Sequence, residues 1–192
     1  MKNLRNDIVG VILAGGQSSR MGQDKALLKC DDLFFVEKIT GTLKNSFSEV
    51  VISANDKQKY NFLNLNIIED EFKNCGPLSG IHATLKFMQK DLFVIACDLP
   101  LVSTNLIEKI LKINTNDSVI FSTSHNHVQP LCGIYKLKTL STLEKYLLNE
   151  NHSVLKYINN IRHTIISNDN ENINELENIN TKEDYLKLIR KD

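Results

Sequence analysis

Tryptophan is absent from this chain of 192 residues, and neither sign of charge is in excess. Lys plus Arg is 23 and Asp plus Glu is 23, so the formal net charge is zero. A neutral chain has no long-range field that would attract nucleic acid or an anionic membrane surface, and we expect neither as a partner. Any site for an anionic ligand must therefore be built locally.

Long apolar runs are also missing. The longest candidates, residues 8–14 and 92–97, have the length of a buried strand, whereas roughly 20 residues are needed to span a bilayer. Residues 1–7 include charged side chains, but no apolar core and cleavage site of a secretion signal follow them. We therefore expect a cytoplasmic protein without a membrane segment.

The cysteines lack the spacing of a metal or redox motif. The four are Cys30, Cys75, Cys97 and Cys132, and none forms a C-x-x-C pair. Zinc knuckles, thioredoxin-type redox pairs and disulfide frameworks need such patterns, so none of them is predicted. Free cysteine behaves as a small apolar side chain, and we expect reduced, mostly buried thiols.

What the sequence does contain is an alternation of strand and helix patterns. Strands are predicted at residues 8–13, 50–52, 65–68 and 92–96, and helices at residues 34–43, 56–63, 79–88 and 104–111. This alternation predicts parallel β-α-β units, and hence an α/β fold with a mostly parallel sheet covered by helices on both faces. The length favours a single domain over residues 1–192.

The second half of the chain departs from this pattern. Residues 119–121 and 131–135 are apolar runs without a clear helix between them, which predicts a small antiparallel insertion near one edge of the sheet. We expect residues 168–180, rich in Asn and Glu, to form a loop. Thr181 and Asp184 have the spacing of a capping box and predict a terminal helix. The remaining predicted elements are helices at 140–148 and 154–158 and a strand at 164–166.

Two adjacent glycines follow the first strand. Residues 13–25 spell L-A-G-G-Q-S-S-R-M-G-Q-D-K, which has the spacing of neither a dinucleotide-binding G-x-G-x-x-G nor a P-loop. Glycines let backbone N–H groups approach an anion, and Arg20 and Lys25 add a guanidinium fork and an ammonium charge suited to a polyphosphate. The alternative is an ordinary strand-to-loop turn with surface cations.

Two aspartates follow predicted strands. Asp98 comes just after residues 92–96, and Asp70 just after residues 65–68. An open α/β sheet binds ligands at the carboxyl ends of its strands, so both carboxylates are expected at that edge. Magnesium binds through one or two carboxylates together with substrate phosphates, which makes Asp98 the candidate metal ligand. A turn-forming aspartate is the alternative at either position.

In their order and spacing, these motifs resemble those of the molybdenum cofactor guanylyltransferases, which are nucleotidyltransferases with a glycosyltransferase-A-like Rossmann fold. The resemblance begins with L-A-G-G-x-x-x-R-M-G-x-D-K at residues 13–25. The later motifs are I-E-D at 68–70, G-P-L-S-G at 76–80, C-D-L-P at 97–100, Q-P at 129–130 and N-I-N-T at 178–181. It extends from about residue 8 to the last helix, and it implies a single-domain three-layer sandwich.

The resemblance also implies roles for individual residues. The groups expected to contact GTP are Leu13, Ala14, Gly15 and Gly16 of the glycine loop and the side chains of Lys25, Asp70 and Asp98. Asp98 would also hold Mg²⁺, the expected cofactor, and Arg20 would join Lys25 on the polyphosphate. Arg20, Lys25 and Asp98 are thus the expected catalytic residues. Asn180 is expected near the metal, with a helix-entry residue as the alternative.

Two positions depart from the family pattern. Ser53 stands where the family often has asparagine in the guanine pocket, so base contacts are expected at Ser53 or shifted to Asn55. The family also often has arginines near residues 151–153, where His152 is the one group here that could become charged. An incidental surface histidine is the alternative for His152.

The activity implied by the resemblance is nucleotidyl transfer from GTP to the terminal phosphate of molybdenum-molybdopterin, giving molybdopterin guanine dinucleotide and pyrophosphate. A phosphate nucleophile is largely ionised near neutral pH, so no general base is required. The alternatives are a molybdopterin cytidylyltransferase, a sugar-1-phosphate nucleotidyltransferase and a non-catalytic cofactor-delivery protein. Molybdopterin-loading and molybdoenzyme-maturation proteins are expected as transient partners.

Overall fold

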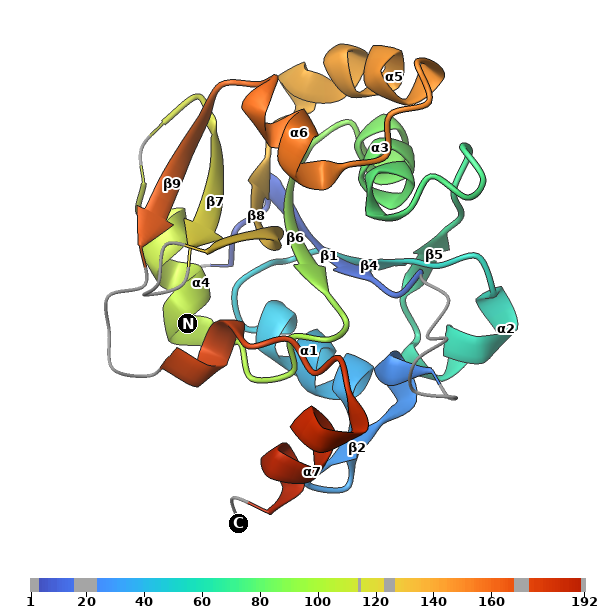
Figure 1. The fold of residues 1–192 in the computed structure, drawn as a ribbon, viewed down its shortest axis with the longest axis vertical. Helices are drawn as coiled ribbons and strands as arrows, with labels where there is room; N and C mark the ends of the chain where they lie inside the picture. Colours follow the sequence, from blue (N-terminus) through green and yellow to red (C-terminus); the bar gives the residue numbers. More distant parts are fainter. Residues whose placement is uncertain (1–3, 16–23, 114, 123–126, 168–172, 191–192) are drawn as a thin grey trace.

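The computed structural model describes residues 4–15, 24–113, 115–122, 127–167 and 173–190. A seven-stranded sheet in the order β5-β4-β1-β6-β8-β7-β9 forms its centre (Figure 1). The strands are β1 (Ile8–Leu13), β4 (Val50–Ser53), β5 (Asn66–Ile68), β6 (Asp91–Ala96), β7 (Ser118–Ser122), β8 (Val128–Tyr135) and β9 (His163–Ser167). The predicted α/β fold with a mostly parallel sheet is confirmed.

Helices cover both faces of this sheet. They are α1 (Phe35–Lys44), α2 (Lys57–Tyr60), α3 (Pro77–Met88), α4 (Thr104–Leu111), α5 (Leu140–Leu148), α6 (Val154–Asn159) and α7 (Lys182–Ile189). One apolar core joins the sheet to α1 and α4, and the other joins it to α3, α5 and α6 (Figure 1). Strand β1 is buried at all six residues, as expected of a strand covered on both sides.

The strands nearest β1 are parallel. Strand β1 pairs in parallel with β4 and β6, and β4 pairs in parallel with β5. The carboxyl ends of these four strands therefore meet at one edge of the sheet, which we call the ligand edge. The glycine loop leaves β1 there, and Asp70 and Asp98 follow β5 and β6 there.

The expected antiparallel insertion is strand β8, which runs antiparallel to both β6 and β7. It lies two strands inside the sheet border formed by β9 rather than at the border itself. The β7–β8 register shifts between Ile120, which faces Gly133, and Phe121, which faces Gln129. A Cβ atom at Gly133 would overlap the carbonyl oxygen of Val119, so only glycine fits this close approach. Because β8 runs the opposite way, its first residues lie at the ligand edge.

Several short elements were not predicted from the sequence. Strands β2 (Lys29–Cys30) and β3 (Leu33–Phe34) form a hairpin through Asp31 and Asp32, which both have positive φ. This turn lacks the Asn-Gly or Asp-Gly pair that usually signals a hairpin. The expected helix at 56–63 divides into α2 and the 3₁₀-helix η2 (Asn61–Leu63). The other 3₁₀-helices are η1 (Lys25–Leu27), η3 (Leu137–Thr139) and η4 (Ile173–Leu176), of which η4 lies in the expected loop.

The terminal helix has the expected capping box. The backbone N–H of Asp184 donates to Thr181 Oγ1 at 3.1 Å, and Asp184 Oδ2 accepts the N–H of Thr181 at 2.8 Å. Helix α7 lies on the hairpin, where the Tyr185 hydroxyl donates to the carbonyl of Lys29 at 2.9 Å. All four cysteines are free, but two of them, Cys75 and Cys97, are only partly buried. Within the described residues, no helix combines the length and apolarity needed to cross a membrane.

Candidate active site

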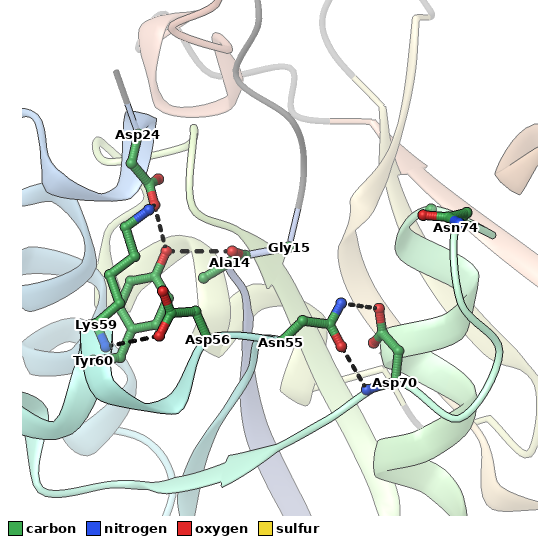
Figure 2. A pocket seen from close by; sticks show the side chains of 10 residues that line it. Ala14, Gly15, Asp24, Asn55, Asp56, Lys59, Tyr60, Asp70 and Asn74 are labelled. Atoms are coloured by element: carbon green, nitrogen blue, oxygen red, sulfur yellow. Dashed lines mark hydrogen bonds and ion pairs between the residues drawn. The ribbon is translucent and has the colours of Figure 1, made fainter. Parts of the chain in front are cut away.

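Two adjoining pockets open at the ligand edge, and both are lined by Ala14, Gly15 and Asp24. The larger one, which we call the wide pocket, has a volume of about 590 Å³ and is shown in Figure 2. Its other lining residues are Asn55, Asp56, Lys59, Tyr60, Asp70, Asn74 and Gly76. The smaller one, the narrow pocket, has a volume of about 180 Å³. Its other lining residues are Leu13, Lys25, Pro77, Ala96, Cys97, Asp98 and Leu131.

A reciprocal pair of hydrogen bonds fixes Asp70 in the wall of the wide pocket. Asn55 Nδ2 donates to the Asp70 carboxylate at 2.8 Å, and the Asp70 N–H donates to Asn55 Oδ1 at 3.2 Å (Figure 2). Burial raises the pKa of Asp70, and the Asn55 hydrogen bond and the charge of Lys73 oppose this shift. The wide pocket therefore contains an oriented carboxylate beside an amide, which can accept hydrogen bonds from a ligand's N–H groups.

Asp24 connects the two pockets and ends the glycine loop. The Tyr60 hydroxyl donates to Asp24 Oδ2 at 2.8 Å and lies 3.3 Å from the carbonyl oxygen of Ala14. Lys59 forms an ion pair with the same carboxylate (Figure 2). Asp24 Oδ1 caps η1 by accepting the N–H of Ala26 at 2.9 Å. These contacts hold helix α2 against the end of β1 and position the residue that follows Asp24, which is Lys25.

Lys25, Asp98 and Asn180 meet at the narrow pocket. Lys25 Nζ donates to Asn180 Oδ1 at 2.6 Å and lies 3.9 Å from Asp98 Oδ2. The side chains of Lys25 and Asp98 are each 18% exposed. Burial raises the pKa of Asp98, and the nearby ammonium of Lys25 opposes this shift. An ammonium and a carboxylate thus share a partly dehydrated pocket, where charge interactions are stronger than in bulk water.

The second oxygen of Asp98 is available for a cation. Asp98 Oδ1 is buried and has no hydrogen-bond partner among the described residues. The part of the chain that the structure describes contains no group of three or more His, Cys, Asp and Glu side chains that could hold a metal. A hard cation at Asp98 would therefore take its remaining ligands from substrate phosphates and water, which is how magnesium is usually bound beside nucleotides. The residues present fit such an ion.

The segment that carries Asn180 is attached to the ligand edge by several hydrogen bonds. The Ile179 N–H donates to the backbone carbonyl of Asp98 at 2.9 Å. Gln129 Nε2 donates to the carbonyl of Leu176 at 3.2 Å and to Asn178 Oδ1 at 2.6 Å. These contacts explain how a residue beyond the last strand of the sheet reaches the narrow pocket.

The structure brings most of the predicted site residues together. Leu13, Ala14, Gly15, Lys25 and Asp98 line the narrow pocket, and Asn55 and Asp70 line the wide one. Gly16 and Arg20 lie outside the described residues.

Two other predicted residues lie elsewhere. Ser53 is 3% exposed and lies next to Asp70. The hydrogen bond from its hydroxyl is another contact that opposes the rise in the pKa of that carboxyl. His152 is exposed just before α6 and lines neither pocket.

Three residues of the site were not singled out from the sequence. Asp24 belongs to the D-K pair that was noted only for its lysine, and Lys59 and Tyr60 lie on a short helix that carries no ligand motif. Tyr60 is 36 residues from Asp24, so no local pattern could pair them. A tyrosine on a short amphipathic helix more often packs in the core, and Tyr60 does so with its ring while its hydroxyl faces the site.

Comparison with known proteins shows similarity in sequence and in fold. A family model for the MobA-like NTP transferase domain matches residues 10–164. A Clostridium perfringens protein named "Probable molybdenum cofactor guanylyltransferase" is 32% identical over 94% of this chain and 95% of its own length. A Carboxydothermus hydrogenoformans protein of the same name is 36% identical over 93% of each chain. The solved structure of molybdopterin-guanine dinucleotide biosynthesis protein A from Archaeoglobus fulgidus shares the fold, with a TM-score of 0.81 at 20% identity over 95% of this chain and 97% of that one.

Proposed function

The chain belongs to the family of MobA-like NTP transferases, and from this membership we propose that it transfers GMP from GTP to the terminal phosphate of molybdenum-molybdopterin. The observation that supports this most directly is the meeting of Lys25, Asp98 and Asn180 beside a pocket large enough for a nucleoside. GTP is a cytoplasmic metabolite, and we propose that the reaction takes place in the cytoplasm.

The wide pocket suits the guanine base. Guanine presents N–H donors on its Watson–Crick edge, and a carboxylate can accept two of them. Asp70 is the carboxylate in this pocket, and Asn55 orients it. Cytosine presents its N4 amino group and no ring N–H on the same edge, so it would engage the carboxylate with fewer donors. The arrangement therefore favours GTP over CTP.

The narrow pocket suits the triphosphate. The backbone at Ala14 and Gly15 and the Lys25 ammonium lie where the phosphates would extend from the wide pocket. Asp98 would hold Mg²⁺ together with phosphate oxygens, and the bound ion would neutralise phosphate charge and stabilise the leaving pyrophosphate. Lys25 is held at its site by Asn180, so its charge is already placed before the substrate arrives.

The reaction needs positioning rather than a base. An oxygen of the acceptor phosphate forms a new bond to the α-phosphorus of GTP, and the bond between that phosphorus and the bridging oxygen to the β-phosphate breaks. The electron pair of the broken bond leaves on pyrophosphate. Because the acceptor phosphate is already largely ionised near neutral pH, the protein contributes alignment and charge stabilisation.

The proposal is tested by incubating the protein with Mg²⁺, purified molybdenum-molybdopterin and GTP, CTP or ATP, and by measuring pyrophosphate release and the mass of the pterin product. We expect a GMP adduct formed selectively from GTP. The variants Lys25→Ala and Asp98→Ala should lower kcat/KM by about 100-fold or more while remaining folded, since each removes charge stabilisation. Lys90→Ala is the control, because Lys90 pairs with Glu49 on the surface near the start of β6.

The other outcomes decide between the alternatives. Selective turnover of CTP would identify a cytidylyltransferase, and turnover only with a sugar phosphate as acceptor would identify a sugar-1-phosphate nucleotidyltransferase. Binding of GTP without any turnover would indicate a delivery protein. Near-normal activity of Lys25→Ala or Asp98→Ala would contradict the roles proposed for these residues.

A further inference from the structure

Strand β8 brings a glutamine to the ligand edge from an unusual direction. Within the described part of the seven-stranded sheet, β8 alone is antiparallel to its neighbours, so it begins where β1 and β6 end. Gln129 is the second residue of β8 and lies at the register shift opposite Phe121. A register shift of this kind can re-aim a side chain, and such irregularities are common beside functional sites.

The amide of Gln129 is engaged with the segment of residues 176–181. Its Nε2 donates to the Leu176 carbonyl at 3.2 Å and to Asn178 Oδ1 at 2.6 Å. Both contacts are long-range, since Gln129 is 47 and 49 residues from its two partners. The two N–H donors of this amide have an acceptor each, which leaves no N–H free for a substrate.

The same segment holds the catalytic lysine. Ile179 is hydrogen-bonded to the backbone of Asp98, and the next residue, Asn180, accepts the Lys25 ammonium at 2.6 Å. Asp184 fixes the other side of the segment by accepting the N–H groups of Asn180 and Thr181. Gln129 therefore anchors the segment at Leu176 and Asn178, three residues and one residue before Ile179, which touches Asp98.

Direct contact between Gln129 and substrate is the competing explanation. The residue that β8 contributes to the narrow pocket is Leu131, and Gln129 lines neither the narrow nor the wide pocket. Its amide contacts Leu176 and Asn178 instead, in the segment that leads to Asn180. This placement favours an indirect role.

We propose that Gln129 is a positioning residue, which holds the 176–181 segment on Asp98 so that Asn180 keeps the Lys25 ammonium in place during GMP transfer. The inference deepens the proposed function and rests on it. Because these contacts leave the wide pocket and its base contacts untouched, loss of Gln129 should lower kcat more than it weakens GTP binding, to which Lys25 also contributes.

The test is Gln129→Met, which keeps the length of the side chain and removes its amide. We expect kcat to fall by about 10- to 100-fold, because a displacement of ~1 Å at reacting groups costs rates of this order. KM and Kd for GTP should change by a smaller factor than kcat, since the contacts to the base in the wide pocket are unchanged and only the contact of Lys25 with the triphosphate is disturbed. Hydrogen exchange at the Ile179 amide should be faster, because its bond to Asp98 is loosened.

The matched control is Gln89→Met. Gln89 also donates Nε2 to a backbone carbonyl, that of Lys86, but it does so on the exposed surface at the end of α3. This variant should retain wild-type kcat and wild-type exchange at Ile179. Asn178→Ala is the second test variant, because its exposed side chain can be removed without disturbing the core. Its kcat should fall like that of Gln129→Met, and the double variant should be no slower than either single one.

The outcomes separate the two proposals. Wild-type kcat in Gln129→Met, a rise in KM for GTP as large as the fall in kcat, or additive losses in the double variant would overturn the positioning role. If the wild-type protein forms no GMP adduct, the proposed function fails. The role of Gln129 as the anchor of the segment is then decided by hydrogen exchange, where unchanged protection of Ile179 in Gln129→Met would overturn it.

Discussion

Asp98 is placed where a charged carboxylate lowers the stability of the fold. Its carboxylate is largely buried, and one of its oxygens has no hydrogen-bond partner within the described residues. The pKa of Asp98 is raised because burial outweighs the attraction of Lys25. A buried polar side chain with a purely structural role normally has hydrogen-bond partners for its polar atoms. The unpartnered oxygen of Asp98 is instead suited to binding a cation.

We therefore expect Asp98→Asn to be inactive and more stable. For an acid whose pKa is raised on folding, the stabilising contribution is complete below the ordinary value of 3.8 and is lost as the pH rises through the folded-state pKa. At pH 7 the wild type is destabilised by its buried, charged carboxylate, and the Asn variant is not. The free energy of unfolding of the variant should therefore be higher by about 1 kcal/mol. Urea unfolding at pH 7 and pH 4 should show the gain shrinking at pH 4. A less stable variant at pH 7 would contradict this account.

Two glycines in helices have opposite environments. A Cβ at Gly80 of α3 would overlap Ser53 Oγ and come within 3.0 Å of Leu13 Cδ2, so α3 can approach the ends of β1 and β4 only with glycine there. A Cβ at Gly41 of α1 would meet nothing within 4 Å. The first glycine is required by packing, and the second only weakens its helix.

Substitution of these two glycines by alanine should therefore change the free energy of unfolding in opposite directions. Gly80→Ala should lower the free energy of unfolding by about 1–3 kcal/mol through overpacking. It should also raise KM for GTP, because Ser53 lies behind Asp70 in the wide pocket. Gly41→Ala should raise the free energy of unfolding by about 0.5–1 kcal/mol. Urea unfolding and steady-state kinetics measure both effects, and a neutral Gly80→Ala would show that α3 can move away without cost.

The sequence predicted the regular elements better than the contacts between them. Strands such as β1 and β6 were predictable because their apolar runs are continuous, and Asp70 and Asp98 because they follow such strands. The β2–β3 hairpin was missed because its turn residues, Asp31 and Asp32, adopt positive φ without glycine. The Asp24–Tyr60 and Gln129–Asn178 contacts join distant parts of the chain, and no local pattern specifies them. Motif resemblance marked Gln129 and Asn178, but only the structure shows that they bind each other.

The helical layer formed by α3 and α5 contains a buried histidine whose charge affects the stability of the fold as a whole. His82 has an exposed fraction of 0%, and neither ring nitrogen has a hydrogen-bond partner among the described residues. Glu144 on α5 lies 3.8 Å away, and the ring packs edge-on against Phe72. Burial lowers the pKa of His82, the charges of Glu71 and Glu144 oppose this shift, and Lys86 adds to it. The charged form of His82 is therefore disfavoured in the folded protein.

This histidine should make the fold sensitive to mild acid. For a base whose pKa is lowered on folding, stability is lost as the pH falls below the ordinary value of 6.5 towards the folded-state pKa. One proton contributes a slope of at most about 1.4 kcal/mol per pH unit. His82→Leu should flatten the wild-type slope in chemical unfolding between pH 6.5 and 5. His152→Gln, at an exposed position, should leave it unchanged, and an unchanged slope in His82→Leu would rule out this origin of acid sensitivity.

The contact between Lys25 and Asn180 also determines when, during synthesis of the chain, the site can be completed. The two residues are 155 positions apart, so at translation rates of about 5–20 residues per second the second is made roughly 8–30 s after the first. Until then a nascent chain can already contain the glycine loop, both pockets' aspartates and most of the sheet, but Lys25 does not yet have its hydrogen bond to Asn180. We therefore expect the proposed catalytic centre to be completed late in synthesis, after the proposed nucleotide pocket, so that an unfinished chain could bind GTP without transferring GMP.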